Sequence, residues 1–235
     1  MAFRDYSEVS SKVIGVGSIS PELSGDSFRN RSRPSFYRDV VKRFLDVLLV
    51  VLTLPIWLPV TLLVMALAAF DGGAPVYFQK RIGRGGRVFS MIKIRTMVRD
   101  AEDKLEQQLR RCAKSRKEWD ETQKLKSDPR ITRVGRFLRK SSLDELPQLI
   151  NVLKGDMSLV GPRPMMVSQR ELYPGTSYFD LRPGITGLWQ VSDRNHANFS
   201  ERARFDDEYL ACVSLREDIS ILLRTVPAVL RGTGY

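Results

Sequence analysis

Hydrophobic residues are concentrated in one uncharged run near the start of the chain. The run extends from Val47 to Phe70, and basic residues stand before and after it. At a helical rise of about 1.5 Å per residue, such a run is long enough to reach across a hydrocarbon core of about 30 Å. Pro55 and Pro59 fall inside the run, and each removes a backbone donor. The pattern therefore predicts a membrane segment broken at a proline.

Two topologies fit this segment equally well. The basic residues on both flanks favour a re-entrant helix that enters the membrane, bends at the prolines and returns, because the cytoplasmic side attracts Lys and Arg. The alternative is a single span with a proline kink, which transmembrane helices tolerate.

The rest of the chain has the pattern of a mixed helix and strand domain. Residues 75–78 and 88–94 are predicted to be short strands on either side of the IGRGGR turn at 82–87. Residues 98–124 are strongly charged and contain no glycine or proline, which predicts one or two exposed helices.

Two further helices are expected towards the end of the chain. Apolar residues at helical spacing predict a helix from Asp144 to Leu153, ended by Gly155. Residues 161–193 are rich in glycine and proline, which indicates ordered loops. The last helix, at about 218–230, is predicted either to pack on the core or to lie in a membrane interface.

Composition and charge limit the classes of partner and of chemistry that fit this chain. The formal net charge of +11 indicates an anionic partner, either anionic lipid or a phosphorylated substrate. Nucleic acid is not expected, because no helix-turn-helix or aromatic RNA-binding pattern occurs. Cys112 and Cys212 match no metal-ligand spacing and fit a reducing compartment. His196 is the only histidine, so any chemistry falls to carboxylates, hydroxyls and cations.

The strongest candidate for chemistry is SSLDELPQL at residues 141–149. Asp144 and Glu145 would point about 100° apart on a helix, so one can act as a nucleophile while the other holds a metal ion. The alternative is structural. Ser142 and Glu145 have the spacing of a capping box, and Asp144 would favour the helix dipole.

Two more motifs suit phosphate binding. Arg163 lies between the prolines of GPRP, where a stiff backbone would hold its guanidinium on a phosphate; the alternative is a turn with a solvent-facing arginine. In RPGITGLWQ, Trp189 is interpreted as a core residue. IGRGGR is not a P-loop, since no Lys-Ser/Thr follows, and its basic residues are candidates for lipid headgroups.

Together these segments resemble a known family. The order KRFLD, a proline-broken apolar segment, FQKRIGRGGRVFSMIKIRTM, SSLDELPQLINVLKGDMSLVGPRP and RPGITGLWQV is similar to that of the bacterial sugar transferases, the monotopic phosphoglycosyl transferases. The resemblance runs from about Tyr37 to Thr225.

The resemblance implies a fold and a location. The fold is a small α/β domain with interfacial amphipathic helices and one re-entrant membrane helix, bent at Pro59. The implied division is a flexible tail at 1–36, the membrane helix at 37–71 and a cytosolic catalytic domain at 72–235. The location is the cytoplasmic face of a bacterial inner membrane, with both termini cytoplasmic and anionic headgroups as lipid partners. Leu58 stands where many relatives have serine.

The resemblance also implies a ping-pong mechanism. Asp144 would attack the β-phosphate of a UDP-sugar and release UMP, and undecaprenyl phosphate would then take the sugar-phosphate from the enzyme. Glu145 matches the ligand of Mg²⁺, and Asp206 matches a supporting acid. The implied phosphate-binding residues are Arg139, Arg163, Lys93 and Arg95.

The expected activity is hexose-1-phosphate transfer, the first membrane step of exopolysaccharide synthesis, with UDP-galactose or UDP-glucose as donor. Two other classes remain as alternatives. A membrane scaffold would need neither acid, and a conventional glycosyltransferase would release UDP. The charged stretch 98–124 is longer than in the smallest relatives, and is either a wall of the nucleotide pocket or a homodimer surface.

Overall fold

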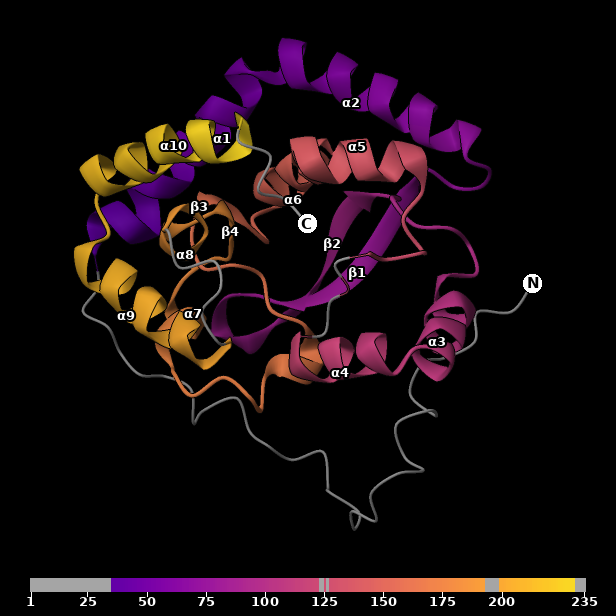
Figure 1. The fold of residues 1–235 in the computed structure, drawn as a ribbon. Coiled ribbons are helices and arrows are strands. Elements are labelled where there is room, and N and C mark those ends of the chain that lie inside the picture. The colour runs from indigo at the N-terminus through magenta and orange to yellow at the C-terminus, as the bar shows by residue number, and fades with distance from the viewer. Residues whose placement is uncertain (1–34, 123–124, 126, 193–198, 231–235) are drawn as a thin grey trace.

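The computed structural model describes residues 35–122, 125, 127–192 and 199–230. Most of the tail expected at 1–36 therefore lies outside the described residues, as does His196. The described part combines helices with two small sheets, which confirms a mixed helix and strand fold (Figure 1).

Two helices at the start of the described part form a bent pair along the top of Figure 1. A π-helical turn, η2 (Tyr37–Val41), leads into α1 (Lys42–Leu52), and α2 (Leu54–Phe70) follows after Thr53. No single helix in the described part is long and apolar enough to cross a membrane. The pair η2–α1 and α2 together meets that length and composition, with a bend of 65° between them.

The bend lies at Thr53, and not at Pro59 as expected. The Thr53 hydroxyl donates to the Leu49 carbonyl at 2.7 Å, and Pro55 stands in the first turn of α2, where its missing N–H is tolerated. Trp57 links α2 back to α1 across the bend, because its indole N–H donates to the Val50 carbonyl at 3.0 Å. Pro59 lies inside α2, which continues beyond it.

An antiparallel hairpin follows the helix pair. The strands β1 (Val76–Ile82) and β2 (Val88–Ile94) pair along their whole length, with Phe78 opposite Ile92. The hairpin confirms both predicted strands, although β1 is longer than expected. Next come the charged helices α3 (Ala101–Arg111) and α4 (Ala113–Thr122), which confirm the two helices expected at 98–124. Their role stays a prediction.

The remaining elements build the second half of the domain. They are, in chain order, α5 (Arg133–Ser141), η4 (Leu143–Glu145), α6 (Gln148–Lys154), β3 (Ser158–Val160), η5 (Val167–Gln169), α7 (Ser177–Asp180), β4 (Gly184–Thr186), α8 (Leu188–Val191), η6 (Phe199–Glu201), α9 (Arg202–Cys212) and α10 (Leu215–Leu230). Gly155 ends α6 with a positive φ of 88°, as its position after the apolar run predicted. β3 and β4 form a short parallel pair.

The bent helix pair shares its core with the rest of the domain. Val50 and Trp57 pack in one buried cluster with Phe89, Met91 and Met157. At the other end of α2, Val64 and Ala68 are buried against residues of β2 and α5.

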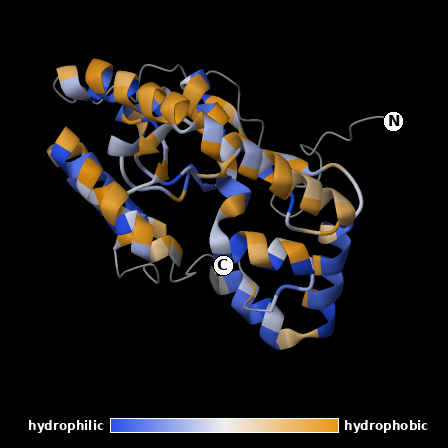
Figure 2. Cartoon of the chain, turned by 90° about the horizontal axis from the view of Figure 1, so that it is seen from above, coloured by the Kyte–Doolittle hydropathy of each residue, from blue (hydrophilic) through white to orange (hydrophobic). Residues whose placement is uncertain are grey.

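The outer face of the same helices is apolar and exposed. Figure 2 looks down on the helices that lie uppermost in Figure 1, and hydrophobic residues dominate them. Ile56, Leu62, Leu63 and Phe70 are each more than half exposed. This face suits a lipid environment, so the re-entrant topology stays a prediction that the bend supports.

Candidate active site

The two acids of SSLDELPQL lie in a tight turn between two helices. Asp144 and Glu145 belong to the 3₁₀ turn η4, and α6 begins only after Pro147. Ser142 has a left-handed backbone with φ of 56°, and its side chain caps nothing, so the capping-box alternative is wrong. Ser142 is the only non-glycine residue of the described part with a positive φ. Such backbone costs on the order of 1–3 kcal/mol and is typical of functional sites.

Lys93 brings a positive charge to both acids. Its Nζ lies 2.7 Å from the nearer Glu145 carboxylate oxygen and 4.0 Å from that of Asp144. Lys93 comes from β2, so the hairpin supplies the cation to a turn that is far away in sequence. The structure therefore brings together three of the residues that the resemblance implied.

Asp144 is almost completely buried, at 7% exposure. Burial raises the pKa of its carboxyl group to about 6, against the opposing effect of Lys93, and the charge of Glu145 adds to the rise. Near neutral pH the group is therefore a carboxylate with little water around it, and a poorly hydrated carboxylate is a better nucleophile than a hydrated one.

Glu145 differs from its neighbour. Burial acts to raise its pKa, but the positive charges of Lys93 and Arg163 outweigh that effect and hold the pKa below its usual value. Glu145 thus stays ionised over a wider pH range than Asp144. Two adjacent acids with pKa values moved in opposite directions suit two different tasks.

Arg139 lies in the last turn of α5, close enough to Asp144 for the two charges to interact. Thr132 caps α5 through the Gly135 N–H at 2.8 Å, and any side chain at Gly135 would overlap the Thr96 carbonyl. This close approach lets Arg139 Nε donate to the Thr96 hydroxyl at 2.8 Å. Burial lowers the pKa of Arg139, and the negative charge of Asp144 acts in the opposite direction. Arg139 is therefore an electrostatic neighbour of the proposed nucleophile.

A small pocket is lined by the arginine of GPRP, whose positive charge also acts on Glu145. Arg163 is exposed, and its guanidinium stands 6.0 Å from the centre of the Trp189 ring. Trp189 is buried, as the core interpretation predicted, but it also lines the pocket. The pocket floor includes Tyr173 and Asp206.

Two arginines that the sequence analysis did not single out complete this pocket region. Arg202 lies 4.4 Å above the Trp189 ring, and burial lowers its pKa to about 10. Burial and the positive charge of Arg163 lower the pKa of Arg81 to about 10. Arg81 is therefore close enough to Arg163 for the two charges to interact. The Nε atoms of Arg81 and Arg202 are buried and have no partner within the described ranges. Clustered cations of this kind are suited to a site for phosphate charge.

Asp206 is the acid that points into the pocket, whereas Asp207 is exposed. The Tyr173 hydroxyl donates to its carboxylate at 2.7 Å. Burial raises the pKa of Asp206 to about 7, although Tyr173 and Arg202 act to lower it. The structure thus places Asp206 in the lining of the same pocket as Arg163 and Arg202.

Arg95 was also predicted to bind phosphate, but in the structure its guanidinium contacts the protein backbone. Its guanidinium donates to the Ala68 carbonyl at 3.1 Å, at the end of α2. A cation at this place offsets the unpaired carbonyls and the dipole of the helix end. Pro59 lies in α2 as well.

Metal ligands are sparse around the acids. The described residues contain no group of three or more His, Cys, Asp or Glu side chains that could hold a metal ion. Mg²⁺, however, is usually held by one or two carboxylates together with substrate phosphates and water. The ionised Glu145 fits this mode of binding.

Comparison with known proteins gives a consistent result. The family model described as bacterial sugar transferase matches residues 37–232. The chain is 47% identical to the UDP-galactose-lipid carrier transferase of Erwinia amylovora, over 83% of this chain and 41% of that protein. It is 45% identical to the exopolysaccharide production protein ExoY of Rhizobium meliloti, over 83% of this chain and 88% of that protein.

A third relative, 37% identical, is the UDP-glucose:undecaprenyl-phosphate glucose-1-phosphate transferase of Caulobacter vibrioides, matched over 82% of this chain and 70% of that protein. The lengths differ within this set. The chain spans about two fifths of the Erwinia relative but most of ExoY.

Proposed function

This chain belongs to the bacterial sugar transferase family, and from that premise we propose that it is a phosphoglycosyl transferase that moves a hexose-1-phosphate from a UDP-sugar to undecaprenyl phosphate. The names of the relatives support this activity, since they include UDP-galactose and UDP-glucose donors and undecaprenyl phosphate as acceptor. Galactose and glucose are accordingly the two donor sugars proposed, and the first membrane step of exopolysaccharide synthesis is the proposed role.

The observation that carries the proposal is the buried Asp144 beside Lys93. A carboxylate at 7% exposure, 4.0 Å from an ammonium group, is a dry nucleophile with a cation at hand for the phosphate it attacks. A scaffold protein has no need of a carboxylate that burial makes costly to ionise.

The reaction proceeds in two displacements. An Asp144 oxygen attacks the β-phosphorus of the donor, and the bond from that phosphorus to the bridging oxygen breaks. UMP leaves with the bridging oxygen, and the hexose-phosphate stays on Asp144 as an acyl phosphate. An oxygen of the carrier phosphate then attacks the same phosphorus, which frees the Asp144 carboxylate and forms undecaprenyl diphosphate hexose.

The other residues of the site hold charge during these steps. Lys93 and Arg163 balance the negative oxygens of the diphosphate, and Lys93 and Arg139 favour the ionised form of Asp144 against the effect of burial. Arg81 and Arg202 add positive charge near the leaving nucleotide. Glu145 would hold Mg²⁺, which when bound supplies further neutralisation of phosphate charge.

The same proposal includes a re-entrant membrane helix with both termini in the cytoplasm. The bent pair and its exposed apolar face support it. An epitope tag at the N-terminus should be reachable only from the cytoplasmic side of oriented membranes. A tag reachable only from the periplasm would show a single span instead.

The test of the activity is the identity of the nucleotide released. Purified protein in detergent receives undecaprenyl phosphate, Mg²⁺ and either UDP-galactose or UDP-glucose. We expect UMP from one donor, abolished by Asp144→Asn and unaffected by Glu208→Gln, which removes an exposed acid of α9. Release of UDP would indicate a conventional glycosyltransferase. Unchanged activity of Asp144→Asn would rule out the covalent mechanism.

A further inference from the structure

The KRFLD segment at the start of α1 has three charged residues, and the proposed function gives none of them a task. Basic residues at the start of a membrane helix commonly meet lipid headgroups. Here Lys42 is 7% exposed and Asp46 is 5% exposed. These two side chains therefore face the protein.

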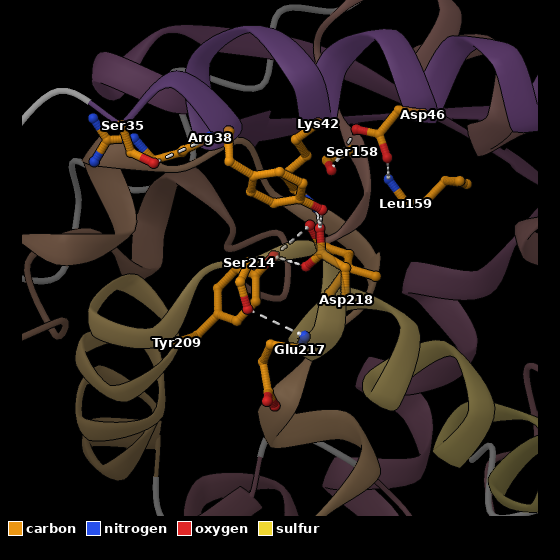
Figure 3. Close-up of polar contacts among 12 residues, drawn as sticks. Ser35, Arg38, Lys42, Asp46, Ser158, Leu159, Tyr209, Ser214, Glu217 and Asp218 are labelled. Carbon is orange, nitrogen blue, oxygen red and sulfur yellow. Dashed lines mark hydrogen bonds and ion pairs between the residues drawn. The ribbon is translucent and has the colours of Figure 1, made fainter.

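Lys42 contacts the last helix of the domain. Its Nζ lies 2.6 Å from a carboxylate oxygen of Asp218 in α10, and both side chains are buried. Tyr37 donates to the same oxygen at 2.6 Å. Tyr209 donates to the other carboxylate oxygen of Asp218 (Figure 3). The ion pair is thus enclosed in a hydrogen-bonded network, which buried charges require.

Arg43 contacts the helix that follows the acid pair. Its guanidinium donates to the Val152 carbonyl and, at 2.8 Å, to the Leu153 carbonyl. These carbonyls belong to the last turn of α6, where unpaired oxygens and the helix dipole both favour a cation. The other end of α6 adjoins the turn that carries Asp144.

Asp46 contacts the strand that leads into GPRP. One carboxylate oxygen accepts from the Ser158 hydroxyl at 2.7 Å, and the other accepts from the Leu159 N–H at 3.2 Å (Figure 3). Both donors belong to β3, and the chain passes directly from β3 through Gly161 to Arg163.

The backbone between Asp46 and Arg163 is tightly held. The Gly161 N–H donates to the Thr186 carbonyl at 2.9 Å, and the Pro162 carbonyl accepts from the Gly184 N–H at 2.8 Å. Any side chain at Gly161 would overlap the Arg182 carbonyl. Because the backbone between β3 and Arg163 is fixed by these contacts, a displacement of β3 would also displace Arg163.

We infer that Asp46 is a positioning residue for Arg163, and that the KRFLD charges align the membrane helix with the site instead of binding lipid. This inference rests on the proposed function for its kinetic consequence. Loss of the Asp46 carboxylate frees two donors of β3, so Arg163 no longer stands at a fixed place for the donor diphosphate. The Michaelis constant for the UDP-sugar is expected to rise about tenfold, with a smaller change in kcat.

The kinetic test combines Asp46→Ala with Arg163→Ala. If Asp46 acts through Arg163, its substitution adds nothing to the Michaelis constant once Arg163 is gone. Effects that multiply in the double variant would overturn the inference and leave the proposed function standing. Asp39→Asn is the matched control, because Asp39 lies in the preceding turn and pairs with Arg84. It is expected to leave the Michaelis constant unchanged.

Two further variants distinguish an effect on the position of Arg163 from a general loss of protein stability. Asp46→Asn keeps an acceptor for the Leu159 N–H and should restore part of the donor affinity. Ser158→Ala removes the shorter of the two contacts without touching the membrane helix. If Asp46→Ala fails to fold, Ser158→Ala takes its place, and its effect on the Michaelis constant must likewise vanish in the Arg163→Ala background.

A measurement without any activity tests the same link. Amide hydrogen exchange in residues 158–164 should become faster in Asp46→Ala, or in Ser158→Ala, than in Asp39→Asn. Equal protection of this segment in all three variants would show that the carboxylate does not hold β3. This outcome would overturn the inference even if no donor sugar released UMP.

Discussion

At the scale of single residues, the burial that is proposed to activate Asp144 lowers the stability of the fold at neutral pH. A carboxyl group whose pKa is raised to about 6 by burial binds its proton more tightly in the folded chain than in the unfolded chain. The fold is therefore favoured at low pH by this group. That contribution is lost as the pH rises from 3.8, the ordinary pKa of an aspartate side chain, through about 6.

Asp144→Asn is expected to stabilise the protein at neutral pH while it abolishes activity. Raising the pKa from 3.8 to about 6 corresponds to about 3 kcal/mol in the free energy of unfolding above pH 7, and to almost nothing near pH 3. Thermal or denaturant unfolding in detergent at both pH values measures this difference. A variant that is less stable than the parent at pH 7.5 would contradict the assigned burial of Asp144.

Residues of a site are easiest to predict from the sequence where they stand in one continuous motif. Asp144 and Glu145 stand in one segment with Arg139, and the structure keeps all three together. Arg81 and Arg202 could not be singled out, because only the folded chain brings them near Arg163. The capping-box alternative failed since Ser142 takes a left-handed backbone, which local spacing does not reveal.

At the scale of elements, the bend between α1 and α2 depends on side chains as much as on proline. The sequence predicted a proline break but placed it at Pro59. At the observed bend the Thr53 hydroxyl donates to the Leu49 carbonyl, and the Trp57 indole donates across the break to the Val50 carbonyl. Such a contact is specified by three-dimensional packing, and no hydropathy pattern contains it.

Trp57→Phe is expected to lower the free energy of unfolding by about 1–3 kcal/mol more than Trp189→Phe. The two substitutions remove the same ring area, but only the Trp57 N–H has a partner, whereas the buried N–H of Trp189 has none among the residues that the structure describes. Unfolding in detergent compares the two variants. Equal losses would show that the indole hydrogen bond does not stabilise the bend.

At the scale of the whole molecule, apolar residues form an exposed stripe on α10 as well as on the bent pair. The stripe consists of side chains at helical spacing that are each more than a third exposed: Leu215, Ile219, Leu223, Val226 and Val229. On the opposite side of α10, Ile221 is fully buried in the core. A helix of this kind is typical of the membrane interface.

Leu223→Trp should therefore place a fluorophore in lipid. In vesicles that contain brominated lipid, its added fluorescence is expected to be quenched strongly by bromine and weakly by aqueous acrylamide. Leu172→Trp is the control, because Leu172 is exposed to a similar degree but lies outside α10. If acrylamide quenches both variants equally, α10 faces water.

The shared core of α1 and α2 with the catalytic elements has a practical and an evolutionary consequence. Removing residues before position 72 would expose Met91 and Met157 and leave Asp218 as a buried charge without its ammonium partner. The bent helix pair is therefore not a detachable module. A fragment that begins at residue 72 is expected to misfold. An exchange of this helix pair between relatives is expected to work only when the contact residues of both halves are inherited together.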